Sequence, residues 1–189
     1  MKVSRISELF IRYILLILLA FQNLFIFSFI FSPATIYPVF FLLKLFFNVY
    51  LTKNIVIINN FIKIELIEAC IASSAYYLLL ILNLSTPNIK LKQRLKAVFF
   101  SFGTFLILNI FRIVLLTFLY VEGNNFFDIT HKLFWYTLST IFVIGIWFVE
   151  VRLFKIKEVP FYSDIKFLFN EIKKSNKTKS SKKHKNSGN

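Results

Sequence analysis

Three residues of this chain carry side chains that could perform acyl transfer, and each stands beside a strongly apolar segment. Cys70 begins one apolar run, Arg112 lies within the run ILNIFRIVLL, and His131 directly precedes another. A thiolate is a nucleophile, an imidazole transfers protons near neutral pH, and a guanidinium stabilises developing negative charge. Each residue also has an ordinary interpretation when it is taken alone. Cys70 could be a small, unreactive apolar residue, and His131 could be a loop histidine at the membrane interface. Arg112 could extend its head group to the interface.

The composition indicates which kind of element must position these residues. The 189 residues are 57% hydrophobic and include 26 Phe but only 4 Gly and 4 Pro, and the mean hydropathy is +0.69. A soluble domain of this length could not bury so much apolar surface. We therefore predict an integral protein of the cell membrane. The single cysteine excludes an internal disulfide.

Hydropathy predicts an all-α fold, a multi-pass transmembrane helical bundle of about five spans, since a crossing needs about 20 largely apolar residues. The expected spans are 13–31, 36–51, 70–86, 97–121 and 133–149. Between the second and third, Asn59 and Asn60 separate two β-branched segments in which residue character alternates with a period of two. This pattern predicts a small external β-hairpin immediately before the cysteine helix.

Basic residues orient the predicted spans. The loop 90–96 and the C-terminal region are rich in Lys and Arg, so both are expected in the cytoplasm. Two spans separate them, and the two assignments therefore agree. The hairpin with Cys70 and the loop with His131 then lie outside. The N-terminus conflicts with this scheme, because two full spans before an external hairpin would place Lys2 and Arg5 outside. Either the first helix is inverted or segment 36–51 does not cross completely.

The charge distribution divides the chain into two regions. Residues 1–158 form the predicted membrane domain, and residues 159–189 form a lysine-rich tail within a chain of net charge +14. Such a tail cannot bury enough apolar surface to fold, and we predict that it is disordered. Basic tails can bind nucleic acid, but a basic tail after a membrane span is typical of a cytoplasmic topology signal facing anionic lipid. No nucleic-acid partner is expected.

This topology predicts that the three reactive residues meet near the outer surface. Arg112 lies nine residues before Val121, about 13 Å along a helix, and Asn109 shares its face. In such a pocket His131 would take the thiol proton of Cys70 and return it to a leaving amine. Arg112 would stabilise the thiolate or the oxyanion. Asp128 would either orient His131 or cap the following helix. No metal or cofactor motif is present.

The ordered segments IEACIASSAYYLLLILNL, LILNIFRIVLLTFLY and FDITHKLFWY resemble the archaeosortase/exosortase family of membrane transpeptidases. They look closest to its small archaeal branch, the pacearchaeosortases, and the resemblance covers about residues 55–158. It implies that Cys70, Arg112 and His131 are the catalytic residues. The family commonly has glycine two residues after the cysteine, where this chain has Ala72. A small residue is kept, but the tightest backbone approach is lost.

The resemblance also implies a substrate and a reaction. Substrates would be exported proteins whose C-terminal tail combines a short motif, one membrane helix and a basic cluster. The enzyme would cut near the motif, hold the product as a thioester on Cys70 and pass it to an acceptor, for which a lipid is one candidate.

Two non-enzymatic alternatives remain open from the sequence. A small transporter or channel subunit would use Arg112 as an anion site and would not need Cys70. A scaffold would depend on its lysine tail instead. The scarcity of Gly and Pro and the lack of paired repeats count against a typical secondary transporter.

Overall fold

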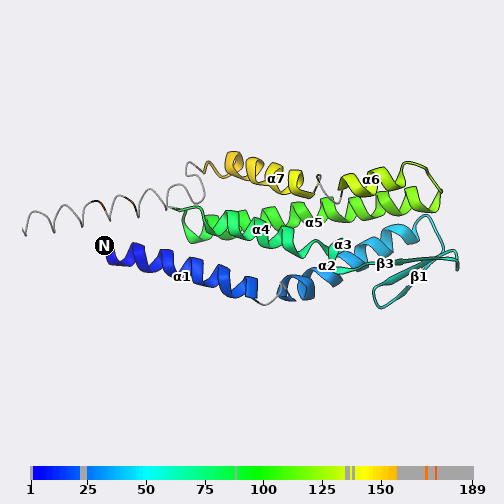
Figure 1. Ribbon diagram of the computed structural model, residues 1–189, viewed down its shortest axis with the longest axis horizontal. Helices are drawn as coiled ribbons and strands as arrows, with labels where there is room; N and C mark the ends of the chain where they lie inside the picture. The colour runs from blue at the N-terminus through cyan, green and yellow to red at the C-terminus, as the bar shows by residue number, and fades with distance from the viewer. Residues whose placement is uncertain are drawn as a thin grey trace, which may run out of the picture.

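The computed structural model describes residues 2–21, 25–87, 89–134, 137, 139–156, 169 and 173, and it is mostly helical with one small antiparallel sheet (Figure 1). In chain order the elements are α1 (Lys2–Phe21), α2 (Phe25–Lys44), β1 (Val49–Thr52), β2 (Ile55–Ile58), β3 (Ile62–Glu65), α3 (Glu68–Ile71), α4 (Ser73–Leu84), α5 (Leu91–Val121), α6 (Phe127–Leu133) and α7 (Ser139–Leu153). Of the predicted disordered tail 159–189, all but Phe169 and Lys173 lie outside the described residues.

Helix α5 is the longest element, and other helices pack along it. Its 31 residues extend about 46 Å. Helices α4 and α7 lie along its N-terminal half, whereas α2, α6 and the sheet lie towards its C-terminal end (Figure 1). Its buried residues recur every four positions, which places them on one face of a helix: Ala97, Ser101, Phe105, Asn109, Ile113 and Thr117. Arg112 is buried next to this stripe.

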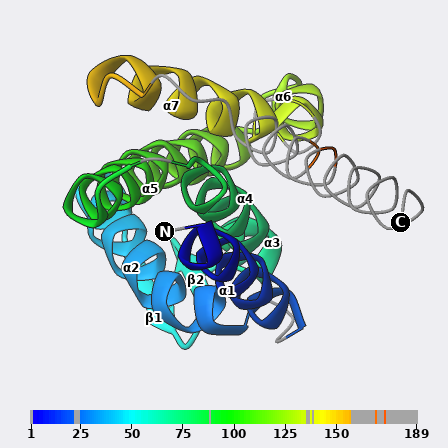
Figure 2. The same cartoon turned by 90° about the vertical axis from the view of Figure 1, so that its left-hand side faces the viewer.

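Helices α1 and α2 run in the same direction, one after the other, along one side of the molecule (Figure 1). Viewed from the end, α1 lies beside α4 (Figure 2), and the Tyr77 hydroxyl donates to the Leu16 carbonyl at 2.8 Å. The expected span 13–31 therefore includes the end of α1 and the start of α2. The expected span 36–51 includes the end of α2 and also part of β1. Val49 contributed to the apolar run, but it lies on a strand and is buried in the core of the protein.

The predicted β-hairpin is confirmed and has a third strand. Strands β2 and β3 pair antiparallel around Asn59 and Asn60, whose φ values of 50° and 65° suit the asparagine side chain. Strand β1 pairs with the other side of β2, giving the order β1-β2-β3. Val56 and Ile58 on β2 are buried in the same core cluster as Leu43 of α2. The sheet therefore packs on the helices at one end of α5.

Two helices, α2 and α5, are long and apolar enough to cross a bilayer. Only 28% of the apolar window of each is buried, so neither resembles the core helix of a soluble protein. Large apolar side chains are also exposed on several helices, among them Phe10, Phe29, Phe41, Ile107, Phe111 and Phe148. Apolar surface of this extent is typical of membrane association. A bundle of five separate spans is not confirmed.

A buried polar cluster joins α4, α5 and α7 near the N-terminal end of α5. The Asn83 side chain donates to Glu150 Oε2 at 3.1 Å, to Ser101 Oγ at 3.4 Å and to the Leu79 carbonyl at 3.0 Å. Glu150 is fully buried, and its Oε1 has no partner among the described residues. This cluster fixes the positions of three helices relative to one another.

We expect Glu150→Gln to be tolerated and Glu150→Ala to destabilise the protein. Glutamine keeps a carbonyl oxygen that can accept from Asn83, whereas alanine leaves that buried amide unpaired and opens a cavity. The predicted loss is about 2–4 kcal/mol for alanine and below about 1 kcal/mol for glutamine. Thermal unfolding in detergent measures both. Equal losses for the two variants would contradict a hydrogen-bonding role for this carboxyl group.

Candidate active site

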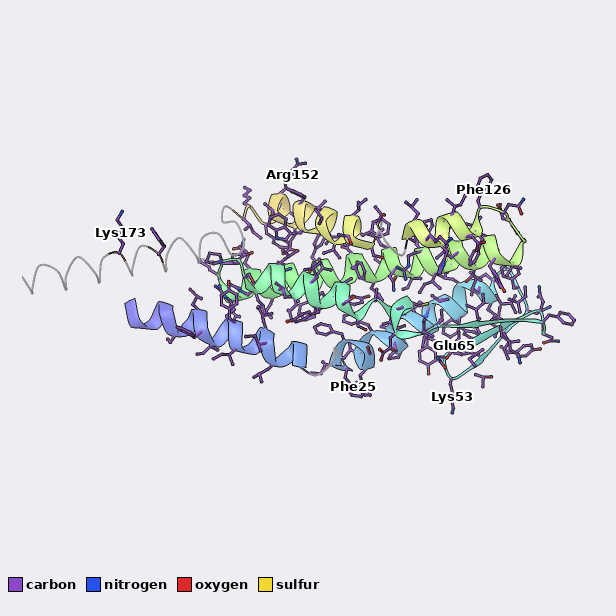
Figure 3. All side chains as sticks on the ribbon, viewed as in Figure 1. Phe25, Lys53, Glu65, Phe126, Arg152 and Lys173 are labelled. Carbon is purple, nitrogen blue, oxygen red and sulfur yellow. The ribbon has the colours of Figure 1, made fainter. Side chains whose placement is uncertain are left out.

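A pocket of about 340 Å³ lies between the sheet, the C-terminal part of α5 and α6. Its volume is within the range of small-molecule and peptide sites. The lining includes all three residues that the sequence predicted to meet, Cys70, Arg112 and His131. The rest of the lining consists of Lys63, Ile64, Glu65, Leu66, Ile67, Ile113, Leu116, Thr117, Tyr120, Phe127 and Phe134. Figure 3 shows Glu65 at the end of the molecule that carries the sheet.

Cys70 reaches the pocket because strand β3 leads almost directly into the short helix α3. Ile67 is the N-cap of α3, and Cys70 is its third residue. The Cys70 backbone N–H donates to the Ile67 carbonyl at 2.8 Å. The thiol is free and half-buried. The sulfur is thus held at the point where the sheet ends and the helices begin.

Ala72 interrupts the helix immediately after Cys70. Its backbone is left-handed, with φ 58° and ψ 44°, and it separates α3 from α4. Such a break leaves the last carbonyls of α3 without partners in the helix. A left-handed conformation costs an alanine about 1–2 kcal/mol, whereas glycine adopts it readily. Glycine would therefore fit this position better than the alanine present.

Replacing Ala72 with glycine is expected to stabilise the protein, and replacing it with valine to destabilise it. Glycine removes the left-handed strain, while a β-branched side chain increases it in a site that is already buried. The expected changes are about 1 kcal/mol in favour of glycine and at least about 2 kcal/mol against valine. Melting temperatures in detergent would show both effects. A glycine variant less stable than the wild type would indicate that the turn is not left-handed.

Two side chains of α5 bind the carbonyl groups that this break leaves free. Asn109 Nδ2 donates to the Cys70 carbonyl at 2.9 Å and to the Ile71 carbonyl at 3.4 Å. Arg112 Nη2 also donates to the Cys70 carbonyl, at 3.3 Å. The i, i+3 spacing puts both residues on the face of α5 that meets α3. The polar residues of the run ILNIFRIVLL therefore hold the backbone of the cysteine segment.

Arg112 additionally links α5 to the start of α7. Its Nη1 donates to Ser139 Oγ at 3.0 Å, and Ser139 in turn donates to the Phe134 carbonyl at 2.9 Å. The side chain is 8% exposed, and its Nε has no partner among the described residues. The guanidinium is consequently fixed in place by two elements, while a positive charge remains at the wall of the pocket.

His131 lies on α6, lines the pocket and is exposed. Its ring stacks on Phe127, with centroids 5.5 Å apart and planes 9° from parallel, and Phe127 also contacts Tyr120 of α5. Aromatic packing therefore orients the imidazole. Asp128 is in the first turn of α6 and outside the pocket lining, and the N-cap of this helix is Phe126. The roles of Asp128 as a group that orients His131 or as a helix cap stay predictions.

Sequence reasoning missed Ser139, Lys63 and Glu65. Ser139 binds Arg112, but a hydroxyl in an apolar run gives little signal by itself. Lys63 and Glu65 lie on the predicted hairpin, and their alternation with Ile62 and Ile64 marked a strand without showing that its edge lines the pocket.

The described residues contain no cluster of side chains typical of a metal site. Within the described part of the chain, no group of three or more His, Cys, Asp or Glu side chains could hold a metal ion.

Searches against family models, curated proteins and solved structures find no match to this chain.

Proposed function

We propose that the protein is a membrane-embedded cysteine transpeptidase, or a peptidase when water is the acceptor. The observation that carries this proposal is that Cys70, Arg112 and His131 line one pocket although they lie far apart in the sequence. The pocket supplies a nucleophile, a group that can exchange protons and a fixed positive charge. These are the components that acyl transfer requires.

The proposed reaction has two stages. His131 takes the proton of the Cys70 thiol, and the thiolate attacks the scissile carbonyl carbon of a peptide bond. The C–N bond breaks, the amine leaves with the proton from His131, and the acyl group remains as a thioester on Cys70. An acceptor amine, hydroxyl or water then attacks the thioester, and the thiol returns.

Asn109 and Arg112 support this chemistry by holding the cysteine in position. Their bonds to the Cys70 carbonyl fix the backbone on which the sulfur is carried. The positive charge of Arg112 at the pocket wall favours an anionic sulfur or oxygen. The ordered residues Cys70, Asn109, Arg112 and His131 are also those on which the archaeosortase/exosortase resemblance rests, and we include that family membership in the proposal.

We propose a membrane topology of four crossings instead of five. Helices α1 and α2 together make one crossing, α3 and α4 the second, α5 the third, and α6 and α7 the fourth. The N-terminus of α1 lies towards the same end of the molecule as the N-terminus of α5 (Figure 1). Lys2, Arg5 and the loop 90–96 then share the cytoplasmic side, in agreement with the positive-inside rule. This arrangement removes the conflict that two separate N-terminal spans create.

The proposed substrates are exported proteins that end in a short motif, a membrane helix and a basic cluster, with lipid as one candidate acceptor. The pocket lies at the end of the molecule that this topology would put outside, which is also where the motif that precedes the substrate's membrane helix would lie.

The proposal is tested by co-expressing the chain with an exported reporter protein. The reporter ends in the tail of a secreted protein from the same organism that has the three-part pattern. We expect the reporter to lose its tail only in cells that contain the chain. A tail that stays intact at full expression of the chain would contradict the proposal.

The transporter alternative is less well supported by the geometry. Arg112 already donates to Ser139 and to the Cys70 carbonyl, and its side chain is almost fully buried. These contacts fix the guanidinium between two protein elements, whereas a transport site has to release its ion again.

A further inference from the structure

We propose that β3 is the docking strand of this site, and that an extended segment of the substrate adds to its free edge to reach Cys70. The inference rests on the proposed function and specifies how the pocket would hold the tailed protein. Recognition would come mainly from backbone hydrogen bonds, as in other cases of strand addition.

Strand β3 has one open edge within the described structure. The order β1-β2-β3 leaves it with a strand on one side only. The Leu66 backbone N–H donates to the Asn54 carbonyl at 2.9 Å, so Leu66 faces β2. Because antiparallel strands direct alternate residues towards their partner, Lys63 and Glu65 direct their N–H and C=O groups away from β2. No backbone bond from another described element reaches these groups.

The pocket follows this open edge. It is lined by all five consecutive residues 63–67. Successive side chains of a strand point to opposite faces, so a cavity on one face of the sheet would meet only every second residue. Contact with all five indicates that the pocket runs beside the strand, where an added strand would lie.

The open edge also leads to the nucleophile. Ile67 is the next edge-facing position after Glu65, and its carbonyl accepts from the Cys70 N–H at 2.8 Å. Positions 63, 65 and 67 follow one another at about 7 Å intervals in extended chain. A peptide paired with Lys63 and Glu65 therefore continues to the sulfur. The facing wall, with Thr117 and Tyr120 of α5 and Phe127 of α6, would receive the side chains of the peptide.

Proline substitutions on β3 test the backbone contribution. Glu65→Pro removes an N–H that points away from β2, at an edge where proline is tolerated. Glu65→Ala keeps this N–H and serves as the matched control, and Lys63→Pro and Lys63→Ala form a second pair. With the tailed reporter as the probe, we expect each proline variant to process at least about tenfold more slowly than its alanine partner. Equal rates within each pair would overturn the inference.

A second measurement does not depend on how the proline variants fold. Proline is placed at each position of the reporter segment that precedes its membrane helix, and the wild-type chain is used throughout. Strand addition predicts that processing falls at every second position, because alternate residues face the docking strand. A profile that does not alternate would overturn the inference. This result decides the matter even if the proline variants of the chain itself fail to accumulate.

The two proposals fail in distinguishable ways. If the wild-type chain does not process the reporter, the proposed function itself is wrong. If processing occurs but neither proline experiment shows the expected pattern, only the docking inference is wrong. A Lys63→Cys variant in a Cys70→Ala background that forms covalent dimers in membranes would assign this edge to a second copy of the chain, and would likewise overturn it.

Discussion

Replacing Cys70 with alanine is expected to reduce the rate of processing of the tailed reporter by at least about 10³-fold, because no other residue of the described pocket can form the thioester. The protein should still insert and fold. The thiol is small, and Asn109 and Arg112 bind the Cys70 carbonyl, which alanine retains. Processing is measured by gel shift of the reporter, and folding by thermal unfolding in detergent.

The matched control for this variant is Ser74→Ala. Ser74 is exposed on α4, four residues after Cys70 and outside the pocket lining. The Ser74→Ala variant should process the reporter at the wild-type rate. Cys70→Ser should be almost as inactive as Cys70→Ala, since a serine hydroxyl is far less nucleophilic here than a thiol. Undiminished processing by Cys70→Ala would show that the pocket is not a cysteine-dependent active site.

Replacing Arg112 with alanine is expected to impair both activity and stability. The change removes the donors to Ser139 and to the Cys70 carbonyl in a buried site. We expect a loss of about 2–4 kcal/mol in unfolding free energy and of about 10²-fold or more in processing. Arg112→Lys keeps the charge but cannot reproduce two separate hydrogen bonds from one planar group. It should recover only a minor part of either loss.

Arg152→Ala provides the control for removal of an arginine. Arg152 is exposed in the last turn of α7, at the other end of the molecule from the sheet (Figure 3). Its removal should change stability by less than about 0.5 kcal/mol. Full activity in Arg112→Lys would show that the charge alone matters and that the two hydrogen bonds to protein groups do not.

The meeting of the reactive residues could be predicted from the sequence because it depends on topology. Hydropathy and charge predict that the ends of successive apolar segments lie on one side, and His131 and Cys70 are both at such ends. The distance of Arg112 from the end of its own segment follows from the 1.5 Å rise per residue of a helix. None of these steps needs knowledge of side-chain packing, and the pocket does contain all three residues.

The role of Arg112 in holding the backbone could not be predicted in this way. It depends on the left-handed turn at Ala72, which frees the carbonyl groups of Cys70 and Ile71. Alanine is a strong helix former, so the sequence gives no sign of a break there. Helix limits near the N-terminus were missed for a related reason. Apolar residues fill both α2 and β1, and hydropathy does not distinguish a helix from a buried strand.

The proposed acyl transfer is tested most directly by capture of the acyl intermediate on Cys70. Membranes that contain the chain and the tailed reporter are quenched during processing, and the chain is analysed by mass spectrometry. A thioester mechanism predicts a hydroxylamine-sensitive adduct on Cys70 whose mass corresponds to the reporter without its tail, and no adduct in the Cys70→Ala variant. Processing that continues without any adduct on Cys70 would contradict it.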